Sequence, residues 1–109
     1  KYLGNISGGG YANEIGVGDS TTAAGAAQTD LQGTSNKVWK PIVTSDRVYV
    51  SSTLYVSVGF GYSEAIFTWN EIGIRDNQGT PVLWARQIDS TPLIKTTSKR
   101  AIIEWQLSL

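Results

Sequence analysis

The 109-residue chain contains neither cysteine nor histidine, and these absences exclude whole classes of function. Without cysteine the chain forms no disulfide of its own and carries no thiolate nucleophile, and without both residue types it builds no Cys/His zinc site. Without histidine it lacks the commonest acid–base catalyst near neutral pH, and a Ser-His-Asp triad cannot be assembled. We therefore expect a protein that is not an enzyme, with no cofactor and no bound metal.

Charge is scarce and evenly balanced. Charged residues make up 17% of the chain, and nine Lys and Arg residues offset nine Asp and Glu residues. This balance provides no basic footprint for nucleic acid and no polybasic signal for an anionic membrane. No apolar run approaches the roughly 18–20 residues that span a bilayer. We expect no nucleic-acid or membrane partner. Because the chain opens at Lys1 without an apolar signal segment, we interpret it as a mature piece or an ordered fragment.

Glycine is unevenly distributed, and its distribution divides the chain in two. Eight of the twelve glycines precede residue 35. Residues 1–13, KYLGNISGGGYAN, are predicted to form a glycine-rich N-terminal arm, because ordering glycine costs much backbone entropy. Residues 14–109 are predicted to form one folded domain, since their number suits a single domain. The 11 serines and 11 threonines predict a surface that is polar without being charged.

A two-residue alternation of apolar and polar side chains dominates from residue 37 onward and predicts strands. Residues 47–60, RVYVSSTLYVSVGF, are interpreted as one long strand with a bend or bulge near Ser51 and Ser52. Residues 101–109 repeat the alternation, with Ile102 as the apolar exception. Further strands are expected at residues 37–44, 65–69, 71–75, 82–86 and 93–96, with turns at 76–79 and 98–100. The predicted fold is all-β: a small antiparallel β-sandwich of about seven to eight strands.

The apolar phase of each predicted strand defines the expected core. Its members are Ile15, Val17, Val48, Val50, Leu54, Val56, Val58, Phe67, Ile72, Ile74, Leu83, Ile103, Trp105 and Leu107. Phe60 is expected to be buried as well, and Trp69 and Trp84 are further candidates because large aromatic rings dominate core energetics.

Two patterns that resemble reactive sites are weak. Residues 16–21, GVGDST, have neither the lysine of a phosphate-binding loop nor the third glycine of a dinucleotide-binding turn, so we interpret them as the end of a strand. Glu64, Glu71 and Asp76 are candidates for the carboxylate pair of a glycoside hydrolase. Turn and edge carboxylates are usually solvated, so a small hydrolase is the least favoured function.

Four tyrosines provide the better functional signal. Tyr49 and Tyr55 lie on the polar side of the long alternating run, and Tyr2 and Tyr11 lie in the arm. An exposed aromatic ring with hydroxylic neighbours suits protein contact or sugar stacking. These four residues are the candidate interface, and packing within the domain is the alternative role for Tyr49 and Tyr55.

Several segments together resemble one family. Residues 14–33, EIGVGDSTTAAGAAQTDLQG, resemble a segment near the start of many small bacteriophage virion proteins and tail-fibre attachment domains. Residues 69–79, WNEIGIRDNQG, and residues 82–86, VLWAR, are similar to two later strands of those proteins. Residues 94–109, IKTTSKRAIIEWQLSL, resemble their closing turn and strand.

The resemblance implies a fold and a setting rather than a reaction. It implies a small β-sandwich in a phage particle, assembled in the host cytoplasm, whose partners are other virion proteins and copies of itself. The favoured function is a tail- or fibre-associated structural component or adaptor that acts through protein–protein contacts. A capsid decoration protein is the first alternative, and a carbohydrate-binding module that recognises a host glycan is the second.

Overall fold

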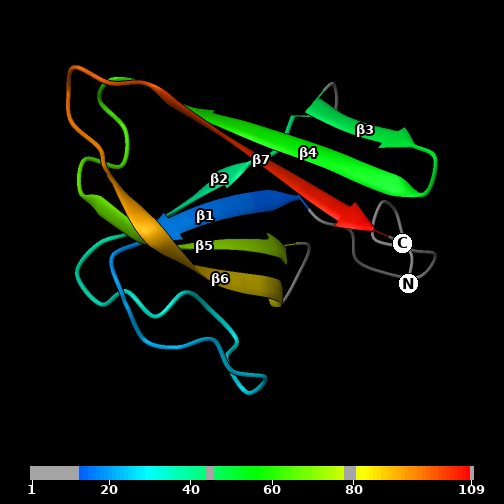
Figure 1. The fold of residues 1–109 in the computed structure, drawn as a ribbon, viewed down its shortest axis with the longest axis horizontal. Helices are drawn as coiled ribbons and strands as arrows, with labels where there is room; N and C mark the ends of the chain where they lie inside the picture. Colours follow the sequence, from blue (N-terminus) through cyan, green and yellow to red (C-terminus); the bar gives the residue numbers. More distant parts are fainter. Residues whose placement is uncertain (1–12, 44–45, 78–80, 109) are drawn as a thin grey trace.

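The computed structural model describes residues 13–43, 46–77 and 81–108, which form seven β-strands and no helix (Figure 1). The strands are β1 (Glu14–Gly18), β2 (Lys37–Pro41), β3 (Arg47–Val50), β4 (Thr53–Phe60), β5 (Thr68–Asp76), β6 (Val82–Ile94) and β7 (Ala101–Ser108). They build a four-stranded sheet in the order β2-β1-β5-β6 and a three-stranded sheet in the order β3-β4-β7. Every described strand pair is antiparallel. The all-β sandwich prediction is confirmed. The predicted arm, residues 1–13, lies outside the described residues except for Asn13.

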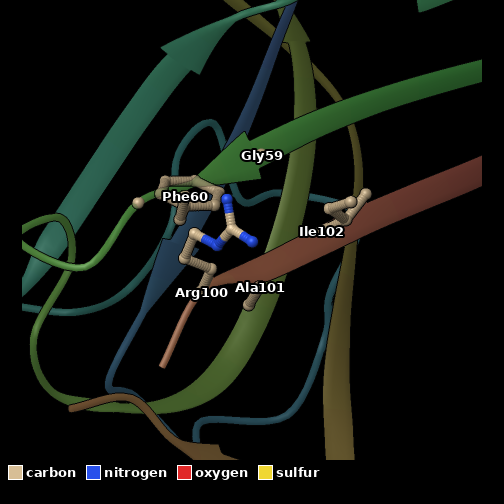
Figure 2. Close-up of a pocket in the computed structure, with 6 residues that line it drawn as sticks. Gly59, Phe60, Arg100, Ala101 and Ile102 are labelled. Carbon is tan, nitrogen blue, oxygen red and sulfur yellow. The ribbon is translucent and has the colours of Figure 1, made fainter. Parts of the chain in front are cut away.

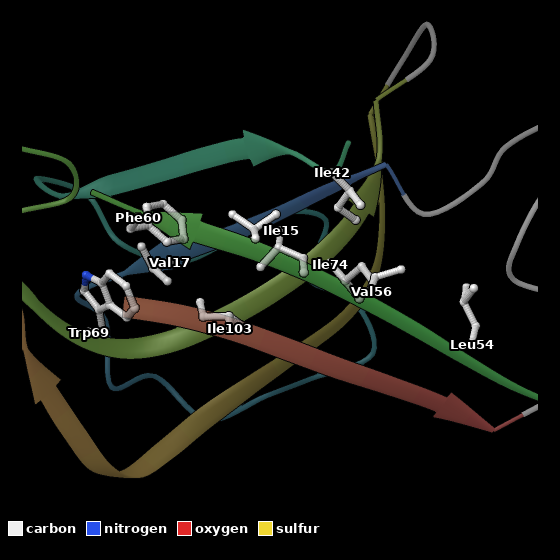
Figure 3. Packing of buried hydrophobic residues seen from close by; sticks show 10 residues of the cluster. Ile15, Val17, Ile42, Leu54, Val56, Phe60, Trp69, Ile74 and Ile103 are labelled. Atoms are coloured by element: carbon white, nitrogen blue, oxygen red, sulfur yellow. The ribbon is translucent and has the colours of Figure 1, made fainter. Parts of the chain in front are cut away.

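The core lies between the two sheets (Figure 3). Seven of the predicted core residues are buried there: Ile15, Val17, Leu54, Val56, Val58, Ile74 and Ile103. Phe60 and Trp69 close one end of the core, with ring centroids 5.0 Å apart and planes inclined by 67°. Phe67, Ile72 and Trp105 are half-buried against this core. Ile42 is buried too, although the sequence pattern did not place it in the core.

Residues 47–60 form two strands rather than one, which corrects the predicted long strand. A two-residue turn at Ser51 and Ser52 joins β3 to β4, and both serines have positive φ, at 47° and 68°. Two positive φ values in a two-residue loop match the twist of a tight hairpin. Val50 therefore pairs with Thr53, and Val48 pairs with Tyr55.

The hairpin reverses the phase of the alternation, so the predicted burial of Val48 and Val50 is wrong. Directly paired residues point to the same face of a sheet. Even positions of β3 consequently share a face with odd positions of β4, which point away from the core. Val48 is 48% exposed and Val50 is 50% exposed.

Strand β6 also differs from expectation, because it joins two predicted strands into one. The separate predictions at residues 82–86 and 93–96 become a single strand that ends at Ile94. Its register with β5 is irregular between Trp69 and Glu71 and again between Ile74 and Arg75. At the first irregularity, residues 89–92 form a local bulge in β6, which explains why the alternation of the sequence breaks there. Leu83 is half-buried rather than fully buried, and the side chain of Leu107 lies outside the described residues.

Candidate interaction surface

The outer face of the four-stranded sheet is covered by the connection between β1 and β2. Two glycines on adjacent strands, Gly16 and Gly73, pair directly and leave a floor without side chains. A β-carbon on Gly16 would lie 2.6 Å from the Trp39 ring and 3.0 Å from Leu31. A β-carbon on Gly73 would lie 2.9 Å from Leu31 and 3.0 Å from Trp39. Only glycine lets these two side chains reach the sheet.

Polar contacts hold this cover in place. The Trp39 Nε1–H donates to Asp30 at 3.0 Å, and Lys37 forms a 2.8 Å ion pair with the same carboxylate. The Arg75 guanidinium lies 4.2 Å from the centroid of the Trp39 ring and is itself paired with Glu14 at 2.7 Å. Burial raises the pKa of Asp30, but hydrogen bonds from Lys37, Trp39 and a backbone N–H outweigh burial, so this pKa lies below its ordinary value of 3.8.

Glu71 is the deepest polar group under the cover. Its carboxylate is fully buried and accepts hydrogen bonds from Arg86 Nε at 2.6 Å and from the backbone N–H groups of Ser20, Gln32 and Gly33 at 3.2, 2.8 and 2.7 Å. Arg86 also donates to Gln28 at 3.1 Å. A buried carboxylate needs such compensation, because losing water is expensive for a charge. Glu71 thus ties both ends of the cover to the sheet.

Two lysines bind the segment of residues 59–67 through an ion pair and a hydrogen bond. Lys40 Nζ forms a 2.7 Å ion pair with Glu64, and buried Lys95 donates to the Gly61 carbonyl at 2.6 Å. The Gly61 N–H and Lys40, which both donate to Glu64, hold the pKa of this carboxyl below its ordinary value of 4.5. Glu64 and Glu71 therefore bind different cations in different segments.

An open pocket of about 600 Å³ lies beside this segment. It is lined by Gly59, Phe60, Gly61, Arg100, Ala101 and Ile102. Figure 2 shows the Arg100 side chain beside Phe60, with Ile102 further along β7. The Arg100 guanidinium lies 5.3 Å from the centroid of the Tyr62 ring, which is 52% exposed.

The outer face of the three-stranded sheet is bare by comparison. Val48, Val50 and Ile102 lie on this face, and Ile102 is 78% exposed. Tyr55 on this face is half-buried and pairs with Val48 on one side and Gln106 on the other, whereas Ile102 pairs with Gly59 further along β4. Glu104 is the charged residue that β7 adds to the face. The exposure of these apolar side chains means that no part of the described chain covers them.

The four tyrosines of the predicted interface are placed unequally. Tyr55 lies on the bare face. Tyr49 pairs with Leu54 across the hairpin, but its side chain lies outside the described residues, as do Tyr2 and Tyr11 entirely. The sequence reasoning missed Val48 and Val50 as surface residues. The available signal was the Ser51–Ser52 pair, which favours a tight turn and hence a change of phase.

Comparisons with family models, with curated proteins and with solved structures find no match to this chain. Within the described part of the chain, no three acidic side chains are grouped so that they could hold a metal ion. The same part contains no helix long and apolar enough to cross a membrane.

Proposed function

We propose that this protein is a non-enzymatic structural component of a bacteriophage particle, associated with the tail or its fibres, that acts through protein–protein contacts. The observation that carries the proposal is the bare outer face of the β3-β4-β7 sheet. Exposed Val48 and Val50 lie there beside Tyr55, and Ile102 lies further along the same face. Exposed apolar patches mark contact sites. The resemblance of residues 14–33 and 69–79 to phage virion proteins supplies the setting.

The chemistry of this face suits repeated copies. Hydroxyl and amide side chains, Thr53, Ser57 and Gln106, surround the apolar residues, and Glu104 is the charge that β7 contributes. A symmetric contact places the same patch on both partners, so a face with little charge avoids repulsion between like groups. We infer that copies of the chain associate through this face in the virion.

Sedimentation velocity over a range of concentrations tests the proposal. Val50→Asp places a charge on the bare face and is expected to abolish association. Val82→Asp is the matched control, because Val82 is 53% exposed, as against 50% for Val50, but lies on the other sheet. Assembly through this face would be contradicted if the chain stays monomeric at every concentration. It would also be contradicted if both substitutions weaken association equally.

Imaging of the intact particle by cryo-electron microscopy tests the location. Density for the sandwich on the tail or its fibres is expected. A radial spike on the shell would instead identify a capsid decoration protein.

Glycan binding is a second candidate, which the exposed Tyr62 ring beside the 600 Å³ pocket favours. Aromatic rings next to polar groups are suited to stacking on sugars. A glycan array with the full chain and the Tyr62→Ala variant tests it. Binding that the variant loses would support glycan recognition, and an array without binding would remove it.

A further inference from the structure

Both sheets end in an open edge on one side of the molecule. Residues of β6 and β7 line one opening on this side, which places the two edges next to each other. The sheet that ends in β6 has four described strands and the sheet that ends in β7 has three. Strand β7 pairs with β4, and no described strand pairs with its other edge.

Three of the four sheet edges in the described chain are short or carry lysine, proline or bulges, whereas β7 has Glu104 as its one charged residue. Strand β2 is five residues long and contains Lys37, Lys40 and Pro41. Strand β3 has four residues, and β6 is interrupted by register shifts and contains Pro92. Short length, lysine, proline and bulges are the usual protections of an edge. Strand β7 pairs through eight residues in unbroken register and contains no proline, glycine or lysine.

The gap beside β7 opens into the space between the sheets. Ile72, Gln87 and residues 103–106 line an opening of about 200 Å³. A second opening of about 230 Å³ continues along Ile72, Gln87, Ile88 and Asp89. Trp105 and Ile72 are half-buried at this side, so additional apolar side chains would complete their burial.

The charges at this side have one sign. Asp89 lines one opening and Glu104 the other, and the residues that line both include no lysine or arginine. Neither carboxylate has an ion-pair partner in the described chain. A strand that added to this edge would gain from a cationic side chain opposite Glu104, because cross-strand pairs of opposite charge are stabilising.

We propose that the open edge of β7 accepts an extended segment of a different protein chain as a fourth strand of the β3-β4-β7 sheet. Main-chain hydrogen bonds to β7 give affinity, as in other strand-addition complexes. Alternate apolar side chains of the segment fill the openings beside Ile72 and Trp105, and a lysine or arginine faces Glu104. This inference rests on the proposed function in one respect only, which is that the added segment belongs to another component of the assembly.

Amide hydrogen exchange measured by NMR on the full chain tests this site. The probe is a synthetic peptide as long as β7, in which valine alternates with threonine and lysine. In an antiparallel sheet alternate residues direct their N–H groups to opposite neighbours. Every second β7 amide should therefore exchange quickly in the free chain and slow about tenfold at a peptide concentration about ten times its Kd. The same peptide with a central proline should give no protection, since proline donates no ladder hydrogen bond.

Two variants separate this inference from the proposed function. Glu104→Lys should raise the Kd of the lysine peptide about fivefold, because an attractive cross-strand pair becomes repulsive. Val48→Lys should leave that Kd unchanged while disrupting association through the bare face.

Three results would overturn the proposal. Slow exchange of all β7 amides in the free chain would mean that its own residues fill the gap. Protection that rises with protein concentration alone would identify a second copy as the occupant. Equal protection by the proline peptide would mean that strand pairing is not involved.

Discussion

The two outer faces of this sandwich are built from similar strands, but one is covered by another segment of the chain and the other is exposed to solvent. On the four-stranded sheet, Gly16 and Gly73 leave a floor that Leu31 and Trp39 occupy, and Glu71 ties down the covering segment. On the three-stranded sheet, Val48 and Val50 remain in solvent. Apolar side chains on an exposed sheet face are available for contact with a partner from outside the chain, whereas a covered face contributes to the stability of the chain itself.

The largest expected loss of stability follows from replacing Glu71, the polar residue that anchors the covering segment to the sheet. Glu71→Ala leaves Arg86 as an unpaired buried charge and three backbone N–H groups without their acceptor. We expect a loss of about 3–5 kcal/mol in the free energy of unfolding, measured in urea. Glu104→Ala, on the bare face, should change it by less than about 0.5 kcal/mol. A loss below about 1 kcal/mol for Glu71→Ala would mean that the anchor contributes little.

Apolar residues on the two faces should differ in the same way. Leu31→Ala removes a side chain that is 2% exposed beneath the cover and should cost about 2–5 kcal/mol. Ile102→Ala removes one that is 78% exposed on the bare face and should be within about 0.5 kcal/mol of the parent. Equal losses in urea unfolding would mean that Ile102 is buried in solution.

Glycines provide a finer comparison. Gly16→Ala forces a β-carbon against the Trp39 ring and should destabilise by about 1–3 kcal/mol. Gly59→Ala, on the bare face, meets no atom closer than the Ile102 side chain at 3.9 Å. Because alanine suits a strand interior better than glycine, Gly59→Ala should be neutral or stabilising by up to about 1 kcal/mol. Thermal unfolding of both variants checks this, and a stable Gly16→Ala variant would contradict the close approach of Trp39.

The smallest expected effect is on pH dependence. The pKa of Asp30 is lower in the folded chain than its ordinary value of 3.8, so its contribution to stability is present above that value. The contribution disappears as the pH falls through the folded pKa. As the pH is lowered below about 4, the unfolding free energy of Asp30→Asn should therefore decline less steeply than that of the parent. If the unfolding free energy declines equally in the parent and in Asp30→Asn at low pH, Asp30 does not help to anchor the covering segment.

Much of the fold follows from local alternation. The alternation within residues 53–60 and 101–108 predicts strands with one apolar face each, and Val56, Val58 and Ile103 are buried as expected. The error at Val48 and Val50 has a local cause, because a two-residue turn exchanges the faces and alternation alone does not locate such a turn.

The covered face is harder to predict because its cause is not local. Glu71 has the opposite phase to Ile72 and Ile74 in the alternation of β5, which predicts a solvated outer side chain. Its burial depends on Gln32 and Gly33, which lie 39 and 38 residues earlier in the chain. Periodicity reports that a strand has two faces, but not whether a distant segment covers the outer one. For the same reason the sequence places Tyr55 on a polar face without indicating what contacts it.

Side-chain footprinting of the full chain, free at low concentration and in the assembly, tests the contrast between the faces most directly. The account predicts that Val48, Val50, Tyr55 and Ile102 are labelled in the free chain and protected in the assembly, while Leu31 is labelled little in either state. Labelling of the first set that is the same in both states, or strong labelling of Leu31 in the free chain, would contradict it.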